Sequence, residues 1–257
     1  MDKSILFYDS GIGGLSTLAK TIQILPNEKY IYFADNLHVP YGNRTNQEIC
    51  DLVYANILAL LKRFKIKLIV IACNTATSLA IDFLRSKIQL PIIGIEPAVR
   101  VAEKKSKTKE ILVIATKATI CSKRYFLLSK SVSCKVHSCF LPSLASKIER
   151  GLIFGSLNID AETNFIKKTL EKFPNIDQIV LGCTHYSLAQ DKLKEQINIS
   201  LSDGNFGVAK NIKRTLKKQN ILRKEGFLNL QIVLSKNSPL LSKKYHEIIE
   251  KQILHQS

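Results

Sequence analysis

Two nine-residue stretches, LIVIACNTA (residues 68–76) and QIVLGCTHY (residues 178–186), decide the fold class of this 257-residue chain. Each is an apolar, β-forming run that ends in a cysteine, Cys73 or Cys183, and continues into a helical pattern. A second pair of similar stretches, ILFYDS (residues 5–10) and ILVIAT (residues 111–116), is separated by nearly the same number of positions. Two pairs with matching offsets predict a duplicated α/β unit.

The rest of the chain alternates between strand-like and helix-like patterns. We expect strands at residues 5–8, 30–34, 67–72, 91–95, 111–115, 135–139, 178–181 and 228–234. We expect helices at residues 15–24, 46–64, 75–87, from 120 onward, and at 143–149, 160–173, 206–218 and 239–254. Strands joined through helices imply right-handed crossovers and mostly parallel sheets.

The predicted fold class is therefore α/β, with two pseudo-symmetric domains, each a mostly parallel sheet flanked by helices, and the active site between them. We expect the first domain to hold residues 1–95 and 204–257, and the second to hold residues 96–203. Both cysteines fall at the carboxyl end of a strand. In open α/β sheets, this is the edge where ligands bind.

The formal net charge of +17 points to nucleic acid as one partner class to consider. Basic residues gather at 62–67, 104–109 and 210–218, mostly at expected helix ends or on helix faces. No zinc-finger spacing, aromatic-rich RNA-binding strand or basic region with heptads accompanies them. We expect a solvated lysine-rich surface, with weak, salt-sensitive polyanion binding as a side effect and no specific nucleic-acid partner.

The apolar runs have the length of strands. Residues 68–73 and 111–115, which are strongly apolar, are far shorter than the ~20 residues of a membrane-spanning helix. Residues 1–10 contain no apolar run long enough for a secretory signal. We expect a cytoplasmic protein with no membrane partner.

The chain has six cysteines. Because it is neither small nor marked for export, this even number does not indicate disulfides. Cys134, His137 and Cys139 lie close together in sequence, but no second ligand pair completes a zinc site. We expect a strand with buried thiols there, and no metal.

Cys73 and Cys183 are the leading candidates for chemistry. A thiol at a helix N-terminus feels the positive end of the helix dipole and unpaired N–H groups, which lower its pKa toward the thiolate. Polar residues follow each thiol, namely Asn74, Thr75, Thr184 and His185. His185, two positions after Cys183, is placed to orient or protonate that thiol.

Two loops complete the expected ligand edge. The segment DSGIGG (residues 9–14) follows a strand and opens a helix, but it lacks the dinucleotide-binding spacing and a Walker lysine. It predicts a glycine loop whose amides bind a small anion such as a carboxylate, with Asp9 and Ser10 beside it. Asp35 ends the next strand, and VPYG (residues 39–42) forms a rigid turn at the same edge.

Together these blocks resemble the bacterial glutamate racemases. The matching blocks follow the family's order across nearly the whole chain: DSGIGGLS (9–16), VPYG (39–42), ACNTA (72–76), GIEP (94–97) and LGCTHY (181–186). The chain departs from the family pattern at ADN (34–36), AT (115–116), Ser187, where proline is customary, and SDG (202–204).

The resemblance implies a two-base racemisation of glutamate that uses no pyridoxal phosphate or other cofactor. By this resemblance, Cys73 takes the proton from D-glutamate and Cys183 takes it from L-glutamate. Asp9 corresponds to a carboxylate that assists the first thiol, and His185 to a histidine that assists the second. Glu149 resembles a further family carboxylate near that histidine.

The resemblance also implies which residues hold the substrate's carboxylates and ammonium group: Asp9, Ser10, Pro40, Tyr41, Gly42, Asn74, Thr75, Thr184 and His185. The implied biological role is the supply of D-glutamate for peptidoglycan. We also expect a homodimer.

Three alternatives remain open from the sequence. An aspartate racemase would keep the mechanism and change the substrate. A binding or regulatory protein on the same fold would use the +17 charge to contact nucleic acid or a DNA enzyme, but it would not need both cysteines. A cysteine hydrolase would use one nucleophile and leave the second matched thiol unexplained.

Overall fold

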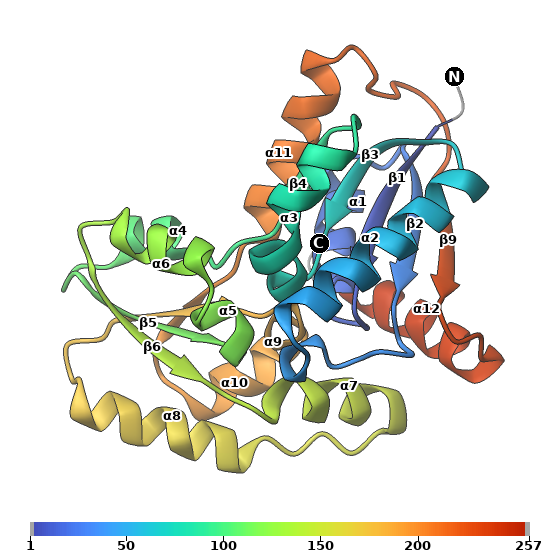
Figure 1. The fold of residues 1–257 in the computed structure, drawn as a ribbon. Coiled ribbons are helices and arrows are strands. Elements are labelled where there is room, and N and C mark those ends of the chain that lie inside the picture. Colours follow the sequence, from blue (N-terminus) through green and yellow to red (C-terminus); the bar gives the residue numbers. More distant parts are fainter. Residues whose placement is uncertain (1–2, 255–257) are drawn as a thin grey trace.

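The computed structural model describes residues 3–254, which form two parallel β-sheets flanked by helices (Figure 1). The strands are β1 (Ser4–Asp9), β2 (Lys29–Ala34), β3 (Ile66–Ile71), β4 (Ile92–Gly94), β5 (Glu110–Ala115), β6 (Lys135–Phe140), β7 (Gln178–Gly182), β8 (Ser200–Ser202) and β9 (Asn229–Leu234). The helices are α1 (Leu15–Ile24), η1 (Tyr41–Asn43, a 3-10 helix), α2 (Asn46–Arg63), α3 (Asn74–Lys87), α4 (Val99–Lys105), α5 (Lys117–Ile120), α6 (Lys123–Lys130), α7 (Leu144–Phe154), α8 (Asp160–Lys172), α9 (Thr184–Leu188), α10 (Gln190–Gln196), α11 (Asn205–Lys218) and α12 (Pro239–Leu254). The predicted fold class is confirmed.

The first sheet has the strand order β4-β3-β1-β2-β9, with every pair parallel. All six residues of β3 are buried, as expected of a parallel strand covered on both faces. Alternate residues of β1 point to opposite faces: Phe7 packs with α1, α11 and α12, and Leu6 packs with α2 and α3. The carboxyl ends of these strands face the second sheet's half of the molecule (Figure 1).

The second sheet repeats this arrangement in a shorter form. Its order is β6-β5-β7-β8, again parallel throughout. This order matches β2-β1-β3-β4, which is the first sheet read from its β9 end without β9. Strand β5 therefore corresponds to β1, and β7 to β3. Leu112 packs against α7, α8 and α10, whereas Val113 packs against α4 and α6 on the other face.

The strands of the two sheets draw on different parts of the chain. Residues 4–94 and 229–234 supply the first sheet, and residues 110–202 supply the second. The chain crosses between the sheets after β4 and again between β8 and α11 (Figure 1). The domain boundaries at residues 95–96 and 203–204 remain a prediction.

Short elements account for most differences from the expected pattern. The sequence predicts one helix from residue 120, but two short helices, α5 and α6, occupy this region. The hydroxyls of Thr116 and Ser122 each accept a backbone N–H and so begin a separate helix. The sequence does not predict helix α4, strand β8 or helix α10, because three to seven residues are too few to establish a period.

One basic residue contradicts the expectation of a solvated lysine surface. Lys67 is only 8% exposed, and its Nζ lies 2.6 Å from Oε2 of the buried Glu28. The same ammonium group donates a hydrogen bond to the carbonyl of Ile221 at 2.8 Å. A buried lysine is stable here because its charge is paired and two of its donors have partners.

Three further features of the described residues concern the cysteines, groups of possible metal ligands and the length of apolar helices. All six cysteines are free, and Cys134 and Cys139 are buried as expected. Among residues 3–254, no three potential metal ligands cluster together. No helix in this range is both long and apolar enough to cross a bilayer.

Candidate active site

The two candidate thiols occupy equivalent positions in the two halves. Cys73 is the N-cap residue of α3 and follows β3, whereas Cys183 is the N-cap residue of α9 and follows β7. Both are buried, and both line one cavity of about 20 Å³ to which each half contributes. The internal duplication of the α/β unit therefore brings one thiol from each half to the same cavity.

The cavity wall contains many of the predicted site residues. The lining residues are Ser10, Val39, Pro40, Tyr41, Gly42, Cys73, Thr75, Thr116, Ala145, Cys183 and His185. Four further predicted residues are buried but do not line it: Asp9, Asn74, Glu149 and Thr184. Asn74 donates its side-chain amide to the carbonyl of Ile95 at 3.4 Å, at the start of the crossover between the halves.

Asp9 connects the two halves by hydrogen bonds. Its Oδ1 accepts the N–H of Gly11 at 2.7 Å, and its Oδ2 accepts the hydroxyl of Thr184 at 3.1 Å. Burial, and then the charge of Glu149, raise the pKa of Asp9 to about 7 against the opposing effects of His185 and these hydrogen bonds. A carboxyl group with this pKa exchanges its proton near neutral pH.

The expectation of a lowered thiol pKa is wrong for Cys73. Burial is the largest effect and, together with the charge of Asp9, raises the pKa of this thiol to about 12. The N–H of Ala76 and the hydroxyl of Ser10, whose Oγ lies 3.7 Å from Sγ, act in the other direction but are weaker. The Cys73 thiolate is therefore hard to form and strongly basic once formed.

The second thiol lies beside a histidine that is held by a carboxylate. Nδ1 of His185 lies 3.9 Å from Sγ of Cys183, and its Nε2 lies 2.6 Å from Oε2 of Glu149. Burial lowers the pKa of His185, but the contacts with Cys183 and Glu149 outweigh it and raise the pKa well above its ordinary value. The imidazolium form is favoured, so His185 is a proton donor next to the thiol.

The glycine loop donates a backbone hydrogen bond to a carboxylate of the protein itself, that of Glu149. We expect from the sequence that the amides of DSGIGG hold a small anionic ligand. In the structure, the N–H of Ile12 donates instead to Oε2 of Glu149 at 3.0 Å. A Cβ on Gly13 would lie 2.4 Å from the Thr184 hydroxyl and 2.6 Å from Nδ1 of His185. The loop is rich in glycine because it packs closely against the other half.

A buried polar network supports the turn at residues 39–42. The hydroxyl of Tyr41 donates to Oδ2 of Asp35 at 2.6 Å, and it lies 2.6 Å from the hydroxyl of Tyr8. Asn56 donates to both Tyr8 and Asp35, at 3.0 and 3.1 Å. The His38 ring bonds to the other oxygen of Asp35 at 2.8 Å. Because the network is fully paired, it fixes the backbone that lines the cavity.

Sequence reasoning missed Thr116 as a site residue. Its hydroxyl lies 2.9 Å from that of Thr75 across the two halves, and it lines the cavity. The signal was present in the internal repeat, because Thr116 holds the same place in ILVIAT that Ser10 holds in ILFYDS. Tyr8 and Asn56 gave no signal of their own, since their role depends on contacts between distant segments.

The sequence of this chain is similar to those of known racemases. A family model described as Asp/Glu/Hydantoin racemase matches residues 14–208. A Clostridium perfringens protein named glutamate racemase is 39% identical over 251 residues, covering 94% of this chain and 95% of the relative.

Solved structures agree with this result. The Francisella tularensis glutamate racemase, in complex with D-glutamate, is 26% identical with a TM-score of 0.80, covering 98% of this chain and 94% of the other. The Escherichia coli glutamate racemase, in complex with L-glutamate and an activator, has a TM-score of 0.86 at 24% identity, covering 97% and 95%. At this identity, the second likeness concerns the fold.

Proposed function

Because this chain belongs to the Asp/Glu/Hydantoin racemase family, we propose that it interconverts L- and D-glutamate by a two-thiol mechanism without pyridoxal phosphate. The single observation that carries the proposal is the pair of matched thiols, Cys73 and Cys183, on one cavity between the two halves. The glutamate racemase relatives in C. perfringens and F. tularensis support the choice of substrate.

Inversion at Cα needs a base on one face of the carbon and an acid on the other. Starting from D-glutamate, the Cys73 thiolate takes the Cα proton and leaves a carbanion. The Cys183 thiol then gives its proton to the opposite face, which yields L-glutamate, a Cys73 thiol and a Cys183 thiolate. The reverse reaction restores the starting state, so atoms and charge balance.

The surrounding groups have distinct proposed roles. The high pKa of Cys73 makes its thiolate a strong base, and the substrate ammonium group favours that thiolate as it enters the site. Asp9 assists Cys73 through its charge and its own proton exchange near pH 7. His185, held by Glu149, assists Cys183 by giving or taking a proton at Nδ1.

The polar lining supplies the substrate contacts in this proposal. Ser10, Thr75 and the backbone of residues 40–42 hold the carboxylates and the ammonium group from the cavity wall. Asn74 and Thr184, which do not line the closed cavity, complete this set once the halves open to admit substrate. Thr116 joins this set by its position on the wall. Fixed donors aimed at a carboxylate stabilise the charge that spreads onto it when Cα loses its proton.

In this proposal, the halves separate during each turnover to admit substrate. About 20 Å³ is close to the space of one water molecule, which is too small for a five-carbon amino acid. Closure then excludes water around the weakly acidic Cα proton.

The test is to incubate purified, PLP-free protein with each glutamate enantiomer in D2O and follow optical rotation and Cα deuteration. We expect racemisation in the parent protein and its loss, by at least about 10³-fold, in both Cys73→Ala and Cys183→Ala. Cys121→Ala, which removes an exposed thiol elsewhere, is the matched control and keeps the activity.

Other outcomes redirect the proposal. Turnover of aspartate but not glutamate would keep the mechanism and change the substrate. Inactivity with both amino acids, from folded protein with reduced thiols, would favour a binding protein on this fold. Loss in only one cysteine variant would favour a single-nucleophile enzyme.

The remaining expectations belong to this proposal as well. They are a role in supplying D-glutamate for peptidoglycan, a cytoplasmic location, a homodimer, and the domain boundaries given above. Size-exclusion chromatography with light scattering tests the dimer directly.

A further inference from the structure

A second cavity lies at the other edge of the first sheet. Its volume is about 640 Å³, and its walls come from the starts of β1, β3 and β4 and from the loop after α11. Strand β3 is six residues long, so the cavity at its start lies about 20 Å from Cys73, which follows its carboxyl end. The proposed racemisation uses none of its residues.

Three cationic side chains line this cavity: Lys3, Lys67 and Arg223. Lys67 is already paired with the buried Glu28, which also accepts the backbone N–H of Arg223 at 2.9 Å. This arrangement fixes the loop but leaves the Arg223 guanidinium group and Lys3 without an anionic partner among residues 3–254.

The Arg223 side chain is packed tightly by its own loop, but its guanidinium group pairs with no carboxylate among residues 3–254. Its Nη1 is buried and has no hydrogen-bond partner in the described part of the chain. A Cβ on Gly226 would lie 2.6 Å from Cζ of Arg223, and the backbone φ of +136° at this position also favours glycine. The loop therefore closes over the guanidinium group, which contributes to the cavity wall.

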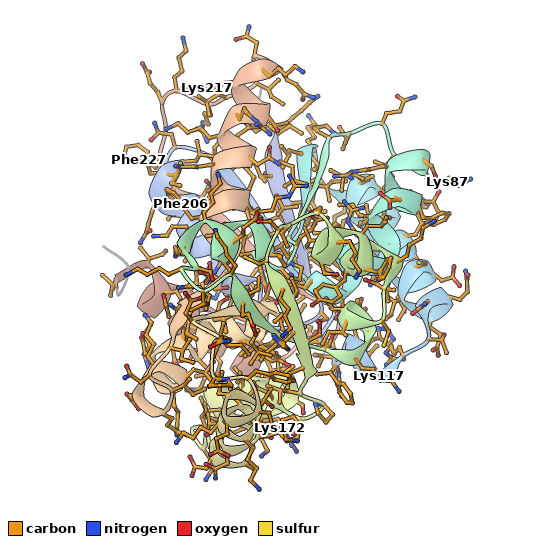
Figure 2. The ribbon with its side chains drawn as sticks, turned by 90° about the vertical axis from the view of Figure 1, so that its left-hand side faces the viewer. Lys87, Lys117, Lys172, Phe206, Lys217 and Phe227 are labelled. Atoms are coloured by element: carbon orange, nitrogen blue, oxygen red, sulfur yellow. The ribbon has the colours of Figure 1, made fainter. Side chains whose placement is uncertain are left out.

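The carbonyl groups at the C-terminal end of α11 do not neutralise the positive charge of Lys3 and Arg223. Asn220, in the left-handed conformation, and Ile221 donate their N–H groups to the carbonyls of Lys217 and Leu216, which caps the helix. Lys217 lies at this end of α11 (Figure 2), and Lys218 follows it. Lysines here offset the negative end of the helix dipole.

The rest of the wall fits a ligand larger than an inorganic ion. Leu90, Pro91 and Leu222 offer apolar contact, and Gln219 and Asn220 offer side-chain amides. A volume of this size falls in the range of sites for drug-sized ligands. An arginine fork with a neighbouring lysine matches the geometry of a phosphate group.

From these features, we propose that this cavity binds a phosphate-bearing small molecule of the size of a nucleoside monophosphate. The phosphate lies between Arg223 and Lys3, and the apolar or planar part of the ligand packs on Leu90, Pro91 and Leu222. The amides of Gln219 and Asn220 bond to polar atoms of that part. The inference is independent of glutamate chemistry.

The test uses calorimetric titration of the whole protein with AMP, inorganic phosphate and adenosine at low and at physiological salt. We expect AMP to bind at millimolar concentration or below, more tightly at low salt, and inorganic phosphate to compete with it. The double variant Lys3→Gln/Arg223→Gln weakens AMP binding by about tenfold or more. Thermal unfolding of this variant verifies that it is folded.

A matched control separates a site from general attraction to a basic protein. Lys172→Gln/Arg100→Gln removes the same charge from exposed positions in the other half; Lys172 lies far from Lys217 in Figure 2. We expect it to bind AMP within about twofold of the parent protein. Hydrogen exchange with AMP present is expected to slow in residues 219–226.

Three results would overturn the proposal. They are equal weakening in both double variants, equal binding of adenosine and AMP, and no binding of AMP by the parent protein. Equal weakening in both double variants would indicate attraction by overall charge alone. Equal binding of adenosine and AMP would indicate an apolar pocket that does not recognise phosphate. Each is distinguishable from failure of the proposed racemisation, because none of these measurements depends on turnover.

Discussion

Oε2 of Glu149 lies 2.6 Å from Nε2 of His185, whose other ring nitrogen faces the Cys183 thiol. They come from different helices, α7 and α9, and the same oxygen accepts the N–H of Ile12 from the other half. One carboxylate oxygen thus fixes the histidine and joins the halves. Tyr245 of α12 donates to the other oxygen at 3.4 Å.

Replacing Glu149 is expected to change the pH dependence of racemisation. In Glu149→Gln, the charge that favours the imidazolium is lost, so the pKa of His185 falls and kcat drops by about 10- to 100-fold. Rates measured across pH with each enantiomer are expected to show the limb assigned to His185 at lower pH. Glu171→Gln, an exposed change on α8, is the control. An unchanged profile in Glu149→Gln would contradict the assigned role.

The close approach at Gly13 predicts sensitivity to a single methyl group. Gly13→Ala places Cβ within 2.8 Å of the backbone N of His185, which cannot rotate away. We expect the halves to close incompletely and racemisation to fall by at least about tenfold, since small misplacements at a reacting centre are costly. Gly207→Ala meets nothing within 4 Å in helix α11 and is expected to stabilise the protein by about 0.5–1 kcal/mol. Full activity of Gly13→Ala would rule out the observed contact as a feature of the working state.

The Tyr8 hydroxyl is expected to stabilise the turn at residues 39–42, which lines the cavity. Tyr8→Phe removes its hydrogen bonds with Tyr41 and Asn56 inside the core, at a cost of about 1–3 kcal/mol in unfolding free energy. We expect KM for glutamate to rise several-fold with a smaller change in kcat, because the turn at 39–42 is one of the proposed substrate contacts. Urea unfolding and initial rates measure the two effects. Tyr54→Phe, whose ring packs edge-on against Phe83, is the control, and equal effects in both variants would remove the network explanation.

Asp9 predicts a distinctive dependence of stability on pH. The folded pKa of Asp9 is about 7, above the unfolded value of about 3.9, so the folded state binds the proton more tightly. Its contribution to stability is therefore fully present below pH ~4 and is lost as pH rises to about 7. Unfolding free energies of the parent minus those of Asp9→Asn are expected to fall across this window. Asp51→Asn, an exposed change, should show no such slope, and a flat difference for Asp9→Asn would refute the raised pKa.

His185 acts in the same direction at higher pH. Because its folded pKa lies well above 6.5, its contribution to stability is lost as pH rises from about 6.5 through the folded value. The two groups together predict a protein that is less stable in alkaline than in mildly acidic solution, as measured by thermal unfolding across pH.

Particular elements show how far sequence reasoning reached. Strands β1, β3, β5 and β7 were evident because each is a continuous apolar run that ends at a polar block. The placement of Cys73 and Cys183 at strand ends followed from the same runs. Strand β8 was missed because its residues Ser200–Ser202 contain one apolar side chain, and its pairing with β7 comes from the rest of the sheet.

Periodicity and turn chemistry are local properties of the chain, so the duplicated α/β architecture and the two thiols at matched strand ends could be predicted from the sequence. The environment of each group depends instead on the tertiary structure. It raised the pKa of Cys73 where the helix dipole alone predicts a decrease, because burial removes the water that stabilises a thiolate. It filled the glycine loop with Glu149 and buried Lys67 against Glu28, because desolvation and pairing depend on residues that the fold brings together from distant parts of the chain.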